Sequence, residues 1–414
     1  MNPNRPTPLV MPALAVMLAG VSAALHVGKL PPAVPALQAG LGISLVQAGF
    51  LLSLVQVAGM TFGLAVGLVA DTLGLRRGML SGLALLTVVG ALGAAVQPGP
   101  QALAWLLILR ALEGLGFLLA VMPGPALIRR LAPAGREKFA LGLWGAYMPF
   151  GVTLALLAGP LLIGWTGWRG WWGGLALLSA LAGLGLLLWV PRDERAAPVD
   201  TAPAPAPWAL RLRETWSAGG PRTLALGFAV YSSQWMAVIG FLPTIYAAAG
   251  VPAGWTAVLT AGAAATNIAG NLLGGRLLQA GVAPQRLLRW GYAVMALGTL
   301  AAFAQWRLGA QVWQLPAAAR YLAVCVFSLC GGMVPATLFM LSVRLAPSPA
   351  TVSTTVGLMQ QASSFGQFAA PPLAAWLAHQ AGGWQWTWAM TGALSLAGIV
   401  VAMRVGARLG GKAH

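Results

Sequence analysis

Acidic residues are scarce in this sequence. Asp and Glu together number 7 among 414 residues, and charged residues of both signs make up 7% of the chain. A soluble domain usually carries about 25% charged residues. Hydrophobic residues make up 58%, and the mean hydropathy is +0.79. A soluble chain of this composition would lack the polar side chains to cover its surface, so we expect most of the chain to lie in lipid.

Cysteine and histidine are also rare. Cys325 and Cys330 lie five residues apart in one apolar run, and on a helix they would point in different directions. His26, His379 and His414 are far apart in the sequence. No disulfide framework, zinc spacing, Ser-His-Asp arrangement or nucleotide-binding P-loop is present. We therefore expect no enzyme activity, no metal and no cofactor.

Long apolar runs fill the chain and predict its fold. They cover residues 9–37, 45–70, 77–97, 102–131, 138–164, 169–190, 222–249, 253–279, 285–306, 319–344, 351–378 and 384–405. Each is long enough for a membrane helix of about 20 residues, and glycine or proline clusters separate several of them. The alternating segments of about ten residues that are typical of a membrane barrel are absent. The sequence predicts an all-α polytopic membrane protein with twelve transmembrane helices.

The basic residues predict the orientation of these helices. With the N-terminus in the cytoplasm, most of the 24 Lys and Arg residues fall in cytoplasmic segments, and only Arg169, Arg307 and Arg320 fall on the other side. Cytoplasmic loops normally carry this excess. It accounts for the net charge of +17, so no nucleic acid is expected as a partner. We expect a multi-pass protein of the bacterial inner membrane with both termini in the cytoplasm.

Matching sequence motifs indicate two related halves. Arg130-Leu-Ala-Pro133 ends the fourth run, and Arg344-Leu-Ala-Pro347 ends the tenth. We predict an N-terminal six-helix half at 1–190, a cytoplasmic linker at 191–221 and a C-terminal half at 222–414. Within the linker, the proline-rich stretch 197–207 is typical of a semi-rigid spacer. The stretch from Trp208 to Trp216 favours either a short amphipathic helix on the inner leaflet or an unstructured segment.

A glycine-rich loop joins the second and third runs. It reads Gly67-Leu-Val-Ala-Asp71-Thr-Leu-Gly74-Leu-Arg76-Arg77, and it resembles the signature loop of the major facilitator superfamily. Thr72 and Leu75 stand where that family usually has basic residues. The resemblance implies a conformational latch at the cytoplasmic face made of Gly67, Asp71, Gly74, Arg76 and Arg77. An ordinary turn rich in positive charge is the alternative.

Other motifs extend the resemblance over the whole chain. Arg110-Ala-Leu-Glu113-Gly114 resembles the family's second motif, with Glu113 where a glutamine is usual. Short segments such as Ala120-Val-Met-Pro123 and Leu358-Met-Gln360 are similar to sequences of the cyanate and nitroimidazole transporter group. The resemblance implies a transporter that alternates access by rocking two halves around a central site.

Two cations are expected deep in the N-terminal half. By the helical rise, Lys29 and Arg110 each lie about 12 Å below the outer end of their run. Buried charges in a membrane are costly and usually functional, so we expect both to bind an anionic group of the substrate. Two alternatives remain open. Lys29 can snorkel to the surface, and Arg110 can form a structural pair with Glu113 three residues later.

Further polar residues complete the predicted site. Glu113 is the best candidate for proton coupling, and a structural counter-ion is the alternative. His26 lies three residues before Lys29 and is expected to contact substrate or relay a proton, or simply to pack. The remaining predicted substrate-binding residues are uncharged and lie at mid-depth, although some of them are expected only to join helices: Tyr147, Gln234, Asn267, Asn271, Gln360 and Gln361.

These features predict a monomeric secondary transporter in the lipid bilayer. We expect its substrate to be a small organic or inorganic anion, moved with or against protons. An efflux pump for apolar or cationic compounds is the first alternative. A non-transporting receptor or scaffold is the second.

Overall fold

The computed structural model describes residues 11–63, 74–133, 140, 144, 146–193, 207–308, 311–348 and 351–410. Its helices before the linker are α1 (Met11–Gly28), α2 (Leu30–Leu41), α3 (Leu45–Leu54), α5 (Leu75–Ala95), α6 (Ala102–Val121), α7 (Gly124–Leu131) and α9 (Tyr147–Trp189). The later helices are α10 (Trp208–Ser217), α11 (Gly219–Ala248), α12 (Ala253–Gln279), α13 (Pro284–Phe303), α14 (Ala317–Leu345), α15 (Val352–Ala381) and α16 (Thr387–Gly410), with a 3-10 turn η2 (Trp384–Trp386) before α16.

These helices account for each of the twelve predicted spans. Within the described residues, eight helical stretches are long and apolar enough to cross a membrane. One of them, α9, has 43 residues and bends at Gly167, whose φ of 71° and ψ of 172° are not helical. Two predicted spans therefore lie in this one element, separated at the glycine-rich break. The predicted all-α membrane fold is confirmed.

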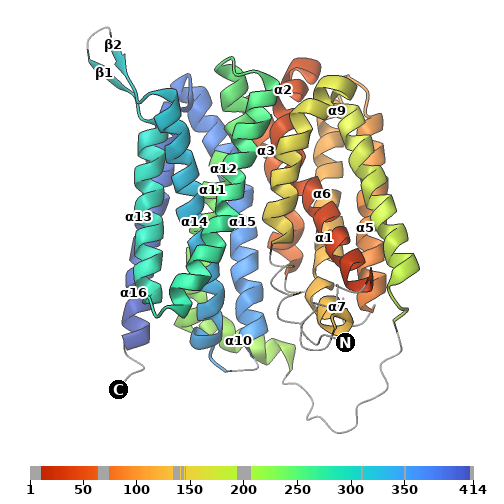
Figure 1. The fold of residues 1–414 in the computed structure, drawn as a ribbon, viewed down its shortest axis with the longest axis vertical. Helices are drawn as coiled ribbons and strands as arrows, with labels where there is room; N and C mark the ends of the chain where they lie inside the picture. The colour runs from red at the N-terminus through yellow and green to blue at the C-terminus, as the bar shows by residue number, and fades with distance from the viewer. Residues whose placement is uncertain are drawn as a thin grey trace, which may run out of the picture.

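One small element was not predicted. The strands β1 (Trp306–Leu308) and β2 (Gln311–Trp313) form an antiparallel hairpin between α13 and α14, with Trp306 opposite Trp313. The ninth span was expected to continue to residue 306, but α13 ends at Phe303. Tryptophan and valine favour strands, and this hairpin extends above the helices in Figure 1.

Apolar side chains pack the first set of helices against the second. Figure 1 shows α1 to α9 on one side and α11 to α16 on the other. Two apolar clusters join the two sets: one includes Leu37, Leu51 and Phe241, and the other includes Leu156 with Phe228 and Val401. A separate cluster near α7 contains only residues from the first set. The division into halves at 1–190 and 222–414 stays a prediction.

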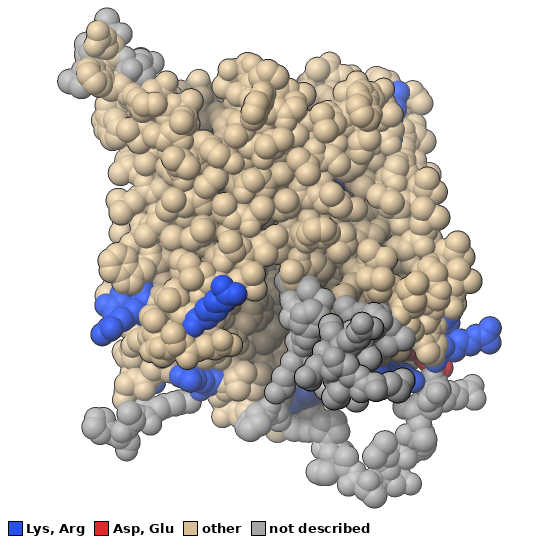
Figure 2. All heavy atoms as spheres, viewed as in Figure 1, with Lys and Arg blue, Asp and Glu red and all other residues tan. Residues whose placement is uncertain are grey.

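Positive side chains gather at the end where α7, α10 and the last turn of α16 lie. Figure 2 shows Lys and Arg near this lower edge of the molecule and a middle band almost free of charge. Helix α10 runs across the same edge in Figure 1. Its Leu210 and Trp216 side chains are 55% and 60% exposed. The helical alternative for this part of the linker is therefore confirmed.

Candidate functional site

The first span is interrupted at Lys29. Helix α1 ends at Gly28 and α2 begins at Leu30. Pro31 follows, and a proline has no backbone N–H to donate to the carbonyl four residues earlier. The carbonyl of Val27 therefore has no donor within its own helix. The sequence creates an unpaired backbone acceptor in the middle of the membrane.

A second interruption lies next to it in α3. This helix ends at Leu54, and the N–H of Gln56 turns to the carbonyl of Ser53 at 2.9 Å. Close by, α6 carries Gly114, where a Cβ atom would collide with the Val55 carbonyl oxygen. Only a glycine lets α6 come this close to the break in α3. The contact places Arg110, one turn earlier on α6, beside both broken helices.

The Arg110 side chain bonds to the carbonyls at both breaks. Its Nε donates to the Leu51 carbonyl at 3.1 Å, and its Nη2 donates to the Val27 carbonyl at 3.2 Å. Its Nη1 donates to the carbonyl of His26. The five N–H donors of a guanidinium suit this task. Arg110 thus joins α6 to α1 and α3, and hydrogen bonds to backbone carbonyls fix the position of its side chain.

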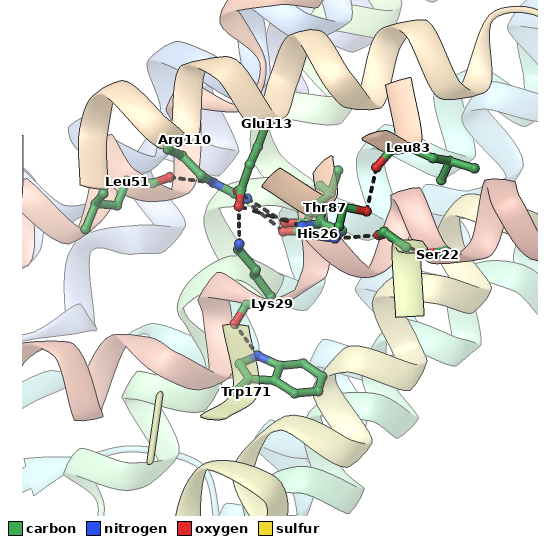
Figure 3. Close-up of polar contacts among 11 residues, drawn as sticks. Ser22, His26, Lys29, Leu51, Leu83, Thr87, Arg110, Glu113 and Trp171 are labelled. Atoms are coloured by element: carbon green, nitrogen blue, oxygen red, sulfur yellow. Dashed lines mark hydrogen bonds and ion pairs between the residues drawn. The ribbon is translucent and has the colours of Figure 1, made fainter. Parts of the chain in front are cut away.

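Glu113 lies between the two predicted cations (Figure 3). Its Oε2 accepts a hydrogen bond from Arg110 Nη1 at 2.8 Å, and its Oε1 pairs with the ammonium of Lys29. Among the described residues, these three are the charged side chains that are buried, and each is at most 2% exposed. We call Lys29, Arg110 and Glu113 the charge cluster. It holds two positive charges and one negative charge.

His26 extends this cluster toward α9. Its Nδ1 is 3.7 Å from Glu113 Oε1, and its Nε2 is 2.9 Å from the Ser179 hydroxyl. The Ser179 hydroxyl is in turn 3.0 Å from the hydroxyl of Ser22. The His26 ring is fully buried. A chain of polar side chains therefore leads from the carboxylate into the N-terminal helices.

Two tryptophans of α9 hold Lys29. The Lys29 ammonium lies 4.4 Å from the centre of the Trp172 ring, and Trp171 Nε1 donates to the Lys29 carbonyl at 3.1 Å. An aromatic face attracts a cation. Beside the cluster is a small cavity with room for about one water molecule, lined by Leu30, Leu37, Leu51, Leu106, Leu109, Arg110, Glu113 and Trp172.

Four of the predicted site residues are thus brought together: His26, Lys29, Arg110 and Glu113. The pair of Arg110 with Glu113 is present, as one alternative expected. Lys29 does not snorkel, because its side chain has no exposed surface. Trp172 and Ser179 were not predicted as site residues. A weak signal existed for Ser22, which is one helical turn before His26.

The predicted polar residues of the C-terminal helices do not form one site. Gln234 accepts a hydrogen bond from Ser395 at 2.8 Å, which joins α11 to α16. Asn267 bonds to Tyr231 and to the carbonyl of Ser328, and Asn271 bonds to Asn267.

The other three predicted residues lie apart from one another. Gln361 donates to the carbonyl of Met60 at 2.7 Å, across the two sets of helices, and Gln360 is exposed. Tyr147 stacks on Trp144, with 4.6 Å between ring centres. Three of the six predicted neutral residues, Gln234, Asn267 and Gln361, therefore join helices.

The predicted latch is described only in part. Gly67 and Asp71 lie outside the described residues, whereas Gly74, Arg76 and Arg77 lie at the start of α5. Gly74 has a φ of 91°, which favours glycine. The carboxylate of Asp193, just after α9, accepts bonds from the N–H groups of Arg76 and Arg77 at 3.0 Å each. Asp193 was not predicted as a partner of this loop, because it is far away in the chain.

A known protein family covers most of this chain. The sequence matches the model of the Major Facilitator Superfamily over residues 13–369. The chain belongs to this superfamily. It is therefore a multi-pass membrane transporter of the secondary type and not an enzyme. No curated protein sequence matches this transporter at a significant level.

Two kinds of solved structure share the fold of this transporter. A bacterial homologue of the human lysosomal transporter Spinster, inward-facing and unoccupied, is 16% identical, with a TM-score of 0.74 over 95% of this chain and 93% of that chain. A D-xylose–proton symporter is 17% identical, with a TM-score of 0.70 over 94% of this chain and 95% of that chain. At these identities the likeness concerns the fold alone.

Proposed function

We propose that this protein carries a small organic or inorganic anion across the bacterial inner membrane, coupled to protons. The observation that carries the proposal is the sharing of one carboxylate, Glu113, by two buried cations, Lys29 and Arg110. The charge cluster keeps one excess positive charge inside the membrane-spanning part. An uncompensated buried charge is costly. A bound anion would give the second of the two cations a partner of its own.

The two cations have different roles in this proposal. Arg110 is tied to three backbone carbonyls and to Glu113, so it positions the carboxylate. Lys29 has a flexible stem and a compact ammonium with three donors. Lys29 is therefore the cation that turns from Glu113 to the substrate. The cavity lined by Arg110, Glu113 and Trp172 lies where a small anion would enter.

Alternating access follows from the arrangement of the two predicted halves, 1–190 and 222–414. Positive side chains at the lower edge in Figure 2 support a cytoplasmic location for that edge and for both termini. The apolar cluster around Leu51 and Phe241 then closes the periplasmic side. The Spinster homologue is inward-facing, and the xylose protein is a proton symporter, which supports the same cycle and coupling here. Rocking would break the contact of Gln361 with Met60.

Binding of anions to the purified protein tests this function. We would measure formate, acetate, benzoate, cyanate and nitrate against formamide, acetamide, benzamide and urea. The anions are expected to bind at least about tenfold more tightly than their neutral analogues, and Lys29→Gln should remove that preference. Arg289→Gln, at an exposed position on α13, is the matched control. Equal binding of charged and neutral compounds would contradict the anion hypothesis and favour efflux of apolar or cationic compounds.

A further inference from the structure

His26 has one satisfied ring nitrogen and one unsatisfied one. Nε2 lies 2.9 Å from the Ser179 hydroxyl. Nδ1 is buried, has no hydrogen-bond partner and lies 3.7 Å from Glu113 Oε1. A buried polar atom without a partner carries a free-energy cost. The unpartnered nitrogen faces the one carboxylate of the cluster, at a distance where a charged ring would form an ion pair with it.

The groups that surround His26 are compatible with both a neutral and a charged ring. A serine hydroxyl can donate or accept a hydrogen bond. With the proton of the neutral ring on Nε2, Ser179 accepts from Nε2–H and the Nδ1 lone pair stays free; this bond is unchanged when Nδ1 takes up a second proton, and Ser22 lies 3.0 Å beyond Ser179. On the other side, a Cβ atom at Gly90 of α5 would lie 3.2 Å from the ring. The pocket fits an imidazole closely and gives Nε2 a partner whether or not the ring is charged.

Glu113 is the weaker candidate for the proton. One of its oxygens pairs with Lys29 and the other with Arg110. A proton on this carboxyl would leave two buried cations without an anion, which is costly. The charged groups that face His26 are these same three: Lys29 from the α1–α2 junction, and Arg110 and Glu113 from α6. Within the described residues, α9 and α5 bring the neutral groups Ser179 and Gly90.

We propose that His26 is the proton-binding residue of the transport cycle and takes up its proton as Lys29 turns from Glu113 to the bound anion. The proton comes from water and binds the lone pair of Nδ1, while Lys29 keeps all of its own protons. The imidazolium then takes the place of Lys29 beside Glu113. One proton and one monovalent anion enter together, so the net charge of the loaded site equals that of the empty site. The inference rests on the proposed anion transport, and it predicts electroneutral symport.

The order of events is set by repulsion. While the Lys29 ammonium remains at Glu113, it opposes a second positive charge on His26. Once Lys29 leaves, Glu113 attracts the proton. Protonation of His26 and departure of Lys29 are therefore linked, and this link can be measured without any substrate.

Nitrogen NMR of histidine tests the link directly. The double variant His379→Gln and His414→Gln leaves His26 as the single histidine in the chain. Adding Lys29→Gln should raise the pH at which half of His26 is protonated by at least about one unit, the size of effect that one nearby charge usually has. Lys29→Arg keeps the charge and should leave that pH near its starting value. An equal midpoint in the Gln and Arg variants, or a ring that stays neutral in both down to pH 5, would overturn the proposal.

Transport in proteoliposomes gives the second test. The probe is whichever of formate, acetate, benzoate, cyanate and nitrate the wild-type protein transports. For His26→Gln, the ratio of proton-driven accumulation to anion exchange should fall at least about tenfold. His379→Gln changes an exposed histidine at the end of α15 and should keep the wild-type ratio. An unchanged ratio in His26→Gln would refute the proton role alone, whereas failure of the wild-type protein to transport any of the anions would refute the proposed function and leave the NMR result to decide the role of His26.

Discussion

The Arg110 guanidinium donates a hydrogen bond to the backbone carbonyl of Leu51 at 3.1 Å, which joins α6 to the point where α3 breaks. The same side chain serves the break in α1. In a membrane, each backbone acceptor without a donor is expensive. Arg110 therefore has a structural task besides its charge.

Removal of this arginine should destabilise the protein. Arg110→Lys keeps one positive charge but cannot reach three carbonyls. Leaving a buried acceptor unpaired costs about 1–3 kcal/mol, so the melting temperature in detergent should fall clearly. The double variant Arg110→Gln with Glu113→Gln should not recover it, because the carbonyls of Val27 and Leu51 remain without donors. Recovery of wild-type melting in the double variant would show that only charge balance matters.

Lys29 should determine anion affinity. A charge-assisted hydrogen bond contributes about 1.5–3 kcal/mol, so Lys29→Gln should weaken anion binding roughly 10- to 150-fold. Lys29→Arg should have a milder effect because the charge remains. Binding titrations on protein with normal melting behaviour measure both. Wild-type affinity in Lys29→Gln would remove Lys29 from the site.

Asp193 should stabilise the start of α5. Its carboxylate accepts the N–H groups of Arg76 and Arg77, and a negative group at a helix N-terminus usually contributes about 0.5–2 kcal/mol. We expect Asp193→Ala to lower the melting temperature and Asp193→Asn to lower it less.

Transport by Asp71→Asn tests the predicted latch separately from the cap. A latch requires a sharp loss of transport in Asp71→Asn at normal expression. Wild-type transport by Asp71→Asn would show that the loop is an ordinary turn and not a latch.

Close packing of α12 on α14 should depend on one glycine. A Cβ atom at Gly270 would collide with the Leu329 carbonyl, whereas at Gly275 nothing lies within 4 Å. We expect Gly270→Ala to reduce the yield of folded protein strongly and Gly275→Ala to be harmless. Size-exclusion profiles of the two variants give the measurement. Equal profiles would mean that α12 shifts at little cost.

The orientation in the membrane is tested by reporter fusions. The distribution of basic residues predicts that fusions after Pro98 and Gly250 report a periplasmic location and that fusions after Ala204 report the cytoplasm. A periplasmic signal from the fusion after Ala204 would contradict the arrangement of six helices on each side of the linker.

The sequence predicted the spans well because lipid leaves a simple pattern: long apolar runs divided by glycine, proline and charge. It also placed Lys29 and Arg110 in one layer from helical rise alone. It could not predict that Glu113 lies between them, since that depends on how α1 turns against α6. The hairpin at Trp306–Leu308 was missed because its strands are only three residues long. Asp193 was missed because its partners are more than a hundred residues away in the chain.

The contacts between α9 and Lys29 couple any movement of this side chain to the helix. Trp171 holds the main chain of this residue and Trp172 faces its ammonium, so Lys29 cannot turn toward a ligand without leaving an aromatic ring. Both tryptophans lie a few residues after Gly167, where α9 changes direction. Under the proposed function, occupancy of the site would therefore be communicated to the corner between the fifth and sixth spans, because the side chain that meets the substrate is also packed against α9.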